Sequence, residues 1–401
     1  MSPAAALAGL GRRSLRAVLP EGVDRRGISV LSTGHLAADL FQGSVPALLP
    51  FLIRERGYSY AAAGALFLMG SLGSSLVQPV LGIYADRVRA SWLMPLGLAL
   101  AAGGLTVAGV AASYPATAVA LLVGGFGVAA FHPEAVRFAT HVSARRRGTG
   151  MSVFAVGGAA GFALGPILTT PLVLWLGLPG TGVVGLVILL AGAVVLVSIP
   201  HLERFRVVGE RHLTAAAGVV DRWGRFSLAA ATGTTRAALA FGLQAFVPSY
   251  AIAELATSEG VGNAAVATML AASAAGTLLG GRLADRLGFR VTVLASLVLQ
   301  VPLAAALPLV PLPGVFAVMG AIGLVGGMCF YPLVAIGQNA IPRHLGLAAG
   351  VMLGLAIGVG AGIVALLGVL GDHAGLTAVL WTIAGIAALG VALGLTLPRD
   401  P

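Results

Sequence analysis

Apolar runs long enough to cross a lipid bilayer recur along the whole of this sequence. Hydrophobic residues make up 58% of the 401 positions and charged residues only 9%, whereas soluble domains carry about 25% charged residues. A membrane-spanning helix needs about 20 mostly apolar residues, and backbone exposed to lipid must satisfy its own hydrogen bonds. The sequence therefore predicts an all-α integral membrane protein.

Apolar runs bounded by charges, prolines and glycines predict twelve transmembrane helices. They cover residues 28–53, 61–84, 91–112, 115–140, 149–175, 181–199, 226–253, 262–284, 291–310, 314–340, 346–370 and 376–397. The 58 glycines suit this interpretation, because small residues let helices approach closely within lipid.

The basic residues predict the orientation. All 24 are arginines, and they gather in the N-terminal tail, in alternate loops and in the central connection, while the opposite loops hold little beyond Arg54 and Arg56. Because loops rich in Arg stay in the cytoplasm, both termini are expected there, in a multi-pass protein of the bacterial cytoplasmic (inner) membrane. The net charge of +10 is scattered between the spans, which favours a topology signal over nucleic-acid binding.

The chain is predicted to divide into two six-helix halves. The divisions are a cytoplasmic tail at 1–27, a first bundle at 28–200, a cytoplasmic linker at 201–225 and a second bundle at 226–401. Two motifs repeat at an offset of 199 residues: the segment 82–87 (GIYADR) matches 281–286 (GRLADR), and 131–133 (FHP) matches 330–332 (FYP). Duplicated halves of this kind are typical of transporters, whose sites lie between the halves.

Several of these segments resemble a known family. GGRLADRLGFR at 280–290 resembles the loop signature of the major facilitator superfamily, and GGAAGFALGP at 157–166 resembles a fifth-helix motif of its drug–proton antiporters. HLAADLFQ at 35–42, QPVLG at 78–82, FHPE at 131–134 and, more loosely, FGLQAFVPSY at 241–250 resemble the fosmidomycin-resistance efflux subfamily. The resemblance implies a monomeric carrier with two pseudo-symmetric bundles that exports small molecules in exchange for protons.

A polar face in the first span predicts proton coupling. His35, Asp39 and Gln42 share one helical face, and Asp39 lies about 16 Å from the start of the span, near the bilayer midplane. Burial favours the neutral form of a carboxylate, so such a group can exchange a proton near neutral pH, and histidine titrates in the same range. We expect Asp39 to be the main coupling group and His35 its modulator. The alternative is a fixed ion pair of Asp39 with Arg236.

The fourth span carries a second polar cluster. Glu134, Arg137 and His141 lie on one face, where the simplest interpretation is an ion pair of Glu134 with Arg137. His132 points away from that face in a straight helix, but a kink at Pro133 is expected to bring His132 and Glu134 to one cavity. A role in proton handling or gating is predicted for this cluster, and more for Glu134 than for His132.

Substrate-binding residues are predicted where polar side chains interrupt apolar spans. Arg236 in the seventh span is suited to an anionic, phosphonate-like group because of its planar guanidinium; pairing with Asp39 or Glu134 is an equal alternative. The other predicted substrate-binding residues are Gln42, Gln244, Tyr331, Gln338 and Asn339.

Two further sets are assigned by position. The resemblance implies that the loop charges form interhelical locks that control access, namely Asp86, Arg87, Asp285, Arg286 and Arg290, with Arg137 as a further gating residue. The small-residue motif of the fifth span is expected to be a packing surface first, and consists of Gly157, Gly161, Gly165 and Pro166.

These observations predict a proton-coupled exporter of drugs or small metabolites. A nucleotide-binding P-loop pattern and the common hydrolase motifs are absent from the sequence, so ATP hydrolysis and enzymatic activity are not expected. The expected partners are a small-molecule substrate, protons and the bilayer, without cofactor or metal. The alternatives are a proton symporter that imports a metabolite and a non-transporting membrane receptor or scaffold.

Overall fold

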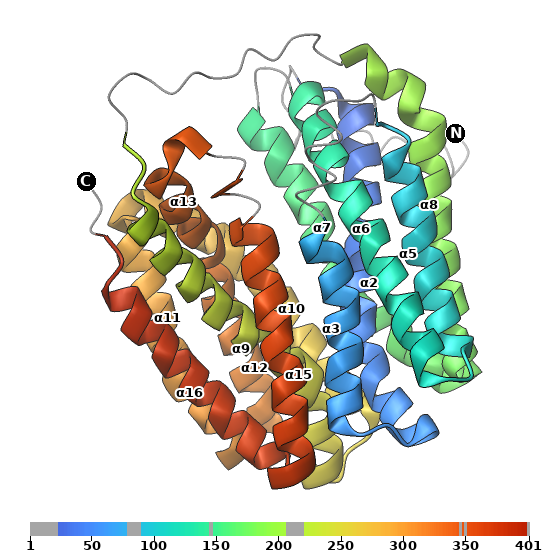
Figure 1. Ribbon diagram of the computed structural model, residues 1–401, viewed down its shortest axis with the longest axis vertical. Coiled ribbons are helices and arrows are strands. Elements are labelled where there is room, and N and C mark those ends of the chain that lie inside the picture. The colour runs from blue at the N-terminus through green and yellow to red at the C-terminus, as the bar shows by residue number, and fades with distance from the viewer. Residues whose placement is uncertain are drawn as a thin grey trace, which may run out of the picture.

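The computed structural model describes residues 23–77, 90–143, 147–205, 220–344, 347–348 and 351–398. The regular elements within these residues are helices (Figure 1). The first group comprises α2 (Arg25–Arg56), α3 (Tyr60–Leu76), α5 (Leu93–Val110), α6 (Tyr114–Val142), α7 (Arg147–Leu176) and α8 (Thr181–Leu202). The second comprises α9 (Trp223–Leu255), α10 (Glu259–Leu287), α11 (Phe289–Ala306), α12 (Leu312–Met328), α13 (Phe330–Ala340), α15 (Ala356–Ala374) and α16 (Leu376–Leu395).

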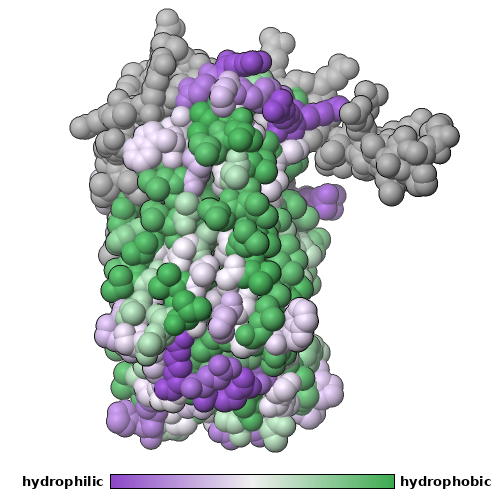
Figure 2. Space-filling model, turned by 90° about the vertical axis from the view of Figure 1, so that its right-hand side faces the viewer, coloured by the Kyte–Doolittle hydropathy of each residue, from purple (hydrophilic) through white to green (hydrophobic). Residues whose placement is uncertain are grey.

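Ten segments of this described chain are long and apolar enough to span a membrane, with α12 and α13 counted together. The predicted spans at 61–84 and 346–370 correspond to α3, which ends at Leu76, and to α15, which is apolar over Gly358–Ala374. Figure 2 shows a largely hydrophobic belt over one face, with hydrophilic residues toward both ends. The prediction of a multi-pass, all-helical membrane protein is therefore confirmed.

The helices fall into two side-by-side groups (Figure 1). In the first, α2 packs against α7 and α5 packs against α6 and α8; in the second, α9 packs against α15 and α16, and α10 against α12. The groups meet where α3 lies along α15 and α7 along α10. α2 begins and α16 ends toward the same end of the molecule in Figure 1. The opposite end, where α2 ends and α3 begins, is called the distal end below.

Glycine lets α2 and α7 pack backbone against backbone. A Cβ at Gly157, Gly161 or Gly165 would overlap the main chain of Ser32, Leu36 or Gly43, respectively. α10 and α12 interlock in the same manner, since Gly276 faces the Leu324 carbonyl and Gly323 faces that of Met269. Small residues at helix contacts allow this close approach in membranes.

The two copies of the Phe-x-Pro motif differ in structure. α6 runs unbroken through Pro133, whereas the predicted span at 314–340 is interrupted at Cys329, between α12 and α13. Pro332 lacks the N–H that would bond to the carbonyl of Met328, and the preceding Gly326–Gly327 pair weakens the helix further. The equivalent positions of α6 are Gly127 and Val128, so that helix has one glycine where the second half has two. The helix is therefore broken at this motif in the second half only.

We expect Gly161→Val to destabilise the protein by about 1–3 kcal/mol, the usual cost of overfilling a packed contact. The added side chain would meet the backbone of Leu36 and force α2 and α7 apart. Gly385→Val on α16 is the matched control, because a Cβ there meets no atom within 4 Å. Thermal unfolding in detergent measures both, and equal Tm values for the two variants would contradict this account of the seam.

Candidate functional site

Two helices bring three titratable side chains together in the first bundle. Asp39 on α2 lies between His35 of the same helix and His132 of α6. His35 Nε2 is 3.3 Å from Asp39 Oδ2, and His132 Nε2 is 3.4 Å from Asp39 Oδ1. The Asp39 carboxylate also accepts from Gln42 Nε2 at 3.2 Å. Asp39 is only 5% exposed and both histidines are half-buried; these three residues are called the His–Asp–His cluster below.

Backbone carbonyls fix the orientation of both imidazoles. His35 Nδ1 lies 2.8 Å from the Phe154 carbonyl of α7, and His132 Nδ1 lies 2.9 Å from the Val128 carbonyl. A carbonyl oxygen only accepts hydrogen bonds, so each Nδ1 must carry the proton. In the neutral imidazoles both Nε2 atoms then present lone pairs to Asp39, and a hydrogen bond at either contact needs one additional proton.

α7 provides the space that the cluster occupies. The Phe154 ring stacks on His35 at a centroid distance of 4.1 Å. One turn further along, a Cβ at Gly158 would lie 2.5 Å from His35 Cε1 and 2.6 Å from Asp39 Oδ2. Gly158 is therefore required for the close approach of α7 to the cluster. The sequence analysis selected its neighbour Gly157 and missed Gly158; the Gly-Gly pair in GGAAG was the available signal.

The cluster offers nitrogen and oxygen atoms that can bind a proton, and the same atoms could bind a metal ion. The three ligand atoms lie within 4.8 Å of one another, which a small metal ion could bridge. However, Gln42 already donates to Asp39 Oδ1, the same oxygen that faces His132. That oxygen therefore already has one hydrogen-bond donor, and the cluster offers the remaining carboxylate and imidazole lone pairs to a proton or a cation.

His132 and Glu134 contact different partners, whereas we expected the kink at Pro133 to bring them to one cavity. Glu134 is fully buried and pairs with Arg137, with Arg137 Nη2 2.6 Å from Oε1 and 2.5 Å from Oε2. α6 continues as a helix through Pro133, so the residues on either side of it keep separate faces. His132 therefore contacts Asp39, Glu134 forms the ion pair with Arg137 that was the simplest interpretation of the sequence, and the stronger role expected for Glu134 stays a prediction.

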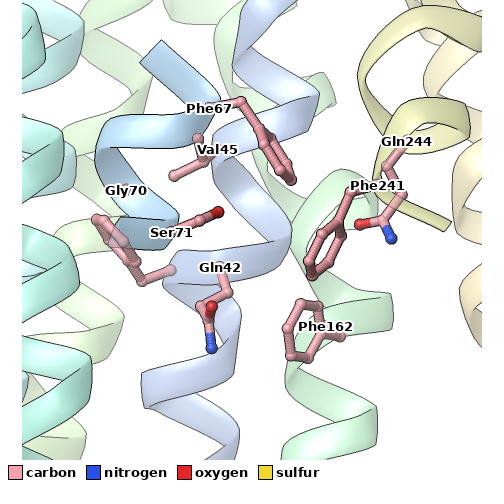
Figure 3. Close-up of a pocket in the computed structure, with 9 residues that line it drawn as sticks. Gln42, Val45, Phe67, Gly70, Ser71, Phe162, Phe241 and Gln244 are labelled. Carbon is pink, nitrogen blue, oxygen red and sulfur yellow. The ribbon is translucent and has the colours of Figure 1, made fainter. Parts of the chain in front are cut away.

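A pocket lies beside the cluster, between the two helix groups (Figure 3). The space is narrow, with room for about one water molecule in this conformation, and it is partly open to solvent. Phe67 of α3 and Phe241 of α9 meet across it, with ring centroids 5.3 Å apart. Gln42 and Gln244, two of the predicted substrate-binding residues, both line it. Gln42 thus contacts the pocket and Asp39 together.

Arg236 lies elsewhere. Its guanidinium carbon sits 4.7 Å from the centre of the Phe330 ring, and the residue lines a second pocket with Thr235, Leu239 and Gln300. In the described residues, neither Asp39 nor Glu134 forms an ion pair with Arg236. Asp39 contacts the two histidines of the cluster, and Glu134 pairs with Arg137. Both predicted ion pairs of Arg236 are therefore absent from this conformation, because each acid has a nearer partner.

The remaining predicted binding residues lie on α13 and outside the two pockets. Tyr331 is 45% exposed, Asn339 is exposed and Gln338 is half-buried. A role for them in substrate binding stays a prediction.

The described residues include only part of the predicted cytoplasmic gate. Asp86 and Arg87 lie outside the described residues. Asp285 and Arg286 are exposed at the end of α10, whereas Arg290 donates to the carbonyls of Leu397 and Leu395, both at 2.8 Å, and so caps the end of α16. A cation suits that position because the C-terminus of a helix carries partial negative charge.

Polar contacts between the two groups occur at the distal end. Arg54 of α2 pairs with Glu259 of α10. Asn263 of α10 donates to the Ala47 carbonyl and to Thr170 Oγ1, both at 2.9 Å. The Asp372 carboxylate of α15 accepts from the backbone N–H groups of Tyr60 and Ala61, at 2.8 and 2.9 Å. The sequence analysis did not identify this distal lock, since its partners are more than 90 residues apart.

The fold and these sites can be compared with known proteins. A family model of the Major Facilitator Superfamily matches residues 31–363. The chain belongs to the major facilitator superfamily. Relatives in this superfamily include an uncharacterised MFS-type transporter, YfnC, of Bacillus subtilis, 30% identical with 92% of each chain covered. The fosmidomycin resistance protein of Escherichia coli is 28% identical with 93% of each chain covered.

Solved transporter structures share the fold of this superfamily member. A bacterial homologue of the human lysosomal transporter Spinster, in an inward-facing and occupied conformation, matches with a TM-score of 0.75 at 15% identity, over 92% of this chain and 96% of that one. The nucleoside transporter NupG matches with a TM-score of 0.75 at 14% identity, over 94% of this chain and all of that one. The family and the fold together identify a membrane transporter.

Glu134→Gln is expected to destabilise this transporter strongly, by about 3–5 kcal/mol, because it leaves the Arg137 guanidinium without the carboxylate beside it. The double variant Glu134→Leu/Arg137→Met is the control, since replacing both charges by apolar side chains is often close to neutral. Thermal unfolding in detergent compares the two. A single variant as stable as the double one would show that the pair is not a structural contact.

Proposed function

We propose that this transporter is a proton-coupled exporter of drugs or small metabolites that works by alternating access. Twelve helices in two six-helix bundles, divided near residues 201–225, would move against each other with both termini in the cytoplasm. The protein would act as a monomeric antiporter in a bacterial inner membrane, driven by the proton gradient without a cofactor. The observation that carries the proposal is the His–Asp–His cluster, which Gln42 joins to the pocket between the bundles.

Proton counting supports a role in coupling. Without an extra proton, the cluster has a net charge of −1 and two contacts at which lone pairs face each other. One extra proton makes it neutral and satisfies one contact; two protons satisfy both and leave a charge of +1. Because a charge is costly within a membrane, the neutral state with one proton is favoured. A single exchangeable proton at the level of the pocket is what a proton antiporter needs.

Gln42 supplies a physical link between proton and substrate. Its amide N–H donates to Asp39, while its side chain lines the pocket. A substrate that hydrogen-bonds to Gln42 would withdraw this N–H from the carboxylate and change how tightly the cluster holds its proton. Binding of one ligand then changes the affinity for the other, and thermodynamic linkage makes the effect reciprocal.

Export is favoured by the fifth-helix glycine motif, which lies in the α2–α7 seam, and by a relative named for fosmidomycin resistance. Import by proton symport is the alternative with the same fold. An anionic, phosphonate-like substrate was expected through Arg236; since that residue lines a different pocket, such a substrate would require a second site. A receptor or scaffold would show no gradient-driven movement of any compound.

We expect Asp39→Asn to abolish coupling. Proteoliposomes with an imposed pH gradient and a metal chelator would be tested with phosphonates, cationic dyes and sugars. Gradient-driven transport should fall at least about tenfold, because the amide neither binds nor releases a proton in this range, while exchange without a gradient should persist. Glu254→Gln, an exposed acid at the end of α9, is the matched control. Transport by Asp39→Asn that still follows the gradient would refute the assignment.

The histidines give a second, independent test. Either His35→Asn or His132→Asn leaves one imidazole on Asp39, so coupling should survive with a changed pH dependence, because one proton acceptor has been lost. The double variant should lose most of the coupling. The pH profile of gradient-driven transport measures this, and two single variants with unchanged profiles would exclude proton sharing across the cluster.

Opening of the distal lock should accompany transport. Glu259→Gln combined with Asp372→Asn removes the charges that hold the two groups together there, so distances across the distal end should lengthen in a larger fraction of molecules. Spin labels at Tyr58→Cys and Thr257→Cys, in a Cys329→Ala background, would report this. Arg56→Gln is the control, because Arg56 bonds to Gly109 and Thr117 within the first group; if it lengthens the distance equally, the lock has no special role.

A further inference from the structure

Gln244 is a buried amide with an unused acceptor. The residue is 4% exposed, and its Oε1 has no hydrogen-bond partner among the described residues. Buried polar atoms are almost always hydrogen-bonded, because a buried acceptor without a donor loses its hydration without compensation. Gln244 lines the pocket between the two groups (Figure 3), so a water molecule in this narrow space, or a ligand that replaces it when the groups move apart, can supply the missing donor.

The rest of the lining is apolar and aromatic. Phe41, Phe67, Phe162 and Phe241 contribute rings, and Ser71 and Gln42 add two further neutral polar groups. Phe67 and Phe241 come from opposite groups, with their rings inclined by 59°. Rings that face a narrow space favour a flat apolar body, which can stack or meet their edges.

None of the side chains that line this pocket is charged. The nine residues include no acid or base. Asp39 is held by two histidines beyond Gln42, and Arg236 lies in the second pocket. A ligand with a fixed charge would lose its hydration on entering without finding a counter-charge, and such transfers are unfavourable. The pocket therefore selects against both anions and cations.

We propose that the pocket binds an uncharged compound with a flat apolar body and an N–H or O–H donor, which hydrogen-bonds to Gln244 Oε1. This inference rests on the proposed function, because it names the substrate class of the exporter's central pocket. It replaces the anionic substrate expected from the sequence with a neutral hydrogen-bond donor.

Three ligands of one shape test the proposal: 2-naphthamide is neutral with an N–H donor, methyl 2-naphthoate is neutral without a donor, and 2-naphthoate is an anion. Binding to the full-length protein in lipid nanodiscs is measured without a gradient and corrected for empty nanodiscs. The amide should bind about tenfold more tightly than the ester, as expected for one net hydrogen bond, and the anion should bind more weakly than either.

Variants of Gln244 isolate the hydrogen bond. Gln244→Leu and the better matched Gln244→Met should each lower the affinity for the amide about tenfold while leaving that for the ester unchanged. Ester binding also reports whether each variant keeps its fold. Equal losses for amide and ester would overturn the role of Gln244, and tighter binding of 2-naphthoate would overturn the substrate class.

The outcome is separable from that of the proposed function. Binding of the amide without gradient-driven transport would support the pocket chemistry and contradict proton-coupled export. Gradient-driven transport of other compounds that depends on Asp39, without binding of the amide, would contradict this inference and leave proton coupling intact.

Discussion

The close contact of α2 with α7 is the constraint on which the site depends. Glycines at 157, 161 and 165 let the backbone of α7 touch that of α2, and Gly158 leaves room for His35 and Asp39. The same proximity brings the Phe154 carbonyl to His35 Nδ1, which fixes the tautomer of that imidazole. A larger residue at any of these four positions would move the histidine away from its carbonyl or close the space around Asp39. The packing motif and the chemical site are therefore one structure.

Charges within the helices are accommodated in three different ways. Insertion scales give a cost of about 2.5–3.5 kcal/mol for a charge at the centre of a bilayer. Glu134 and Arg137 cancel each other within one helix, Arg54 and Glu259 cancel each other between the two groups, and Arg236 rests on an aromatic ring. Asp39 alone among these is surrounded by groups that can themselves take up protons. Its charge can therefore be removed by a proton instead of being balanced permanently, which distinguishes it from the structural pairs.

Much of this arrangement could be predicted from the sequence. The apolar runs predict most of the helices to within a few residues, because the hydrophobic requirement acts on every residue of a span; the exceptions are the break at Cys329 and the start of α15 at Ala356, ten residues after the predicted start. His35, Asp39 and Gln42 were placed together correctly, because they are near neighbours on one helix. The contact of His132 with Asp39 was not predicted, because it depends on how α6 is rotated against α2, and helical periodicity within α6 says nothing about that rotation. The alternative ion pairs of Arg236 are absent from the described residues for the same reason: depth in the membrane can be estimated by counting residues, whereas direction around the helix axis is set by tertiary packing.

α2 carries two residues of the His–Asp–His cluster, one wall of the pocket and part of the distal lock. Asp39 and Arg54 are fifteen residues apart, or about 22 Å along a straight helix, and Gln42 lies between them. Pro46 and Pro50 also lie between them, and each removes one backbone hydrogen bond, so bending costs least there. The bond lost at Pro46 is the one to the carbonyl of Gln42, the residue that touches both Asp39 and the pocket. In the proposed function, a change in the protonation of Asp39 or in the ligand bonded to Gln42 would therefore act on α2 where its backbone is least restrained, on the segment that leads to Arg54. A rigid α2 would transmit the same change only as a displacement of the whole helix, which its glycine seam with α7 resists.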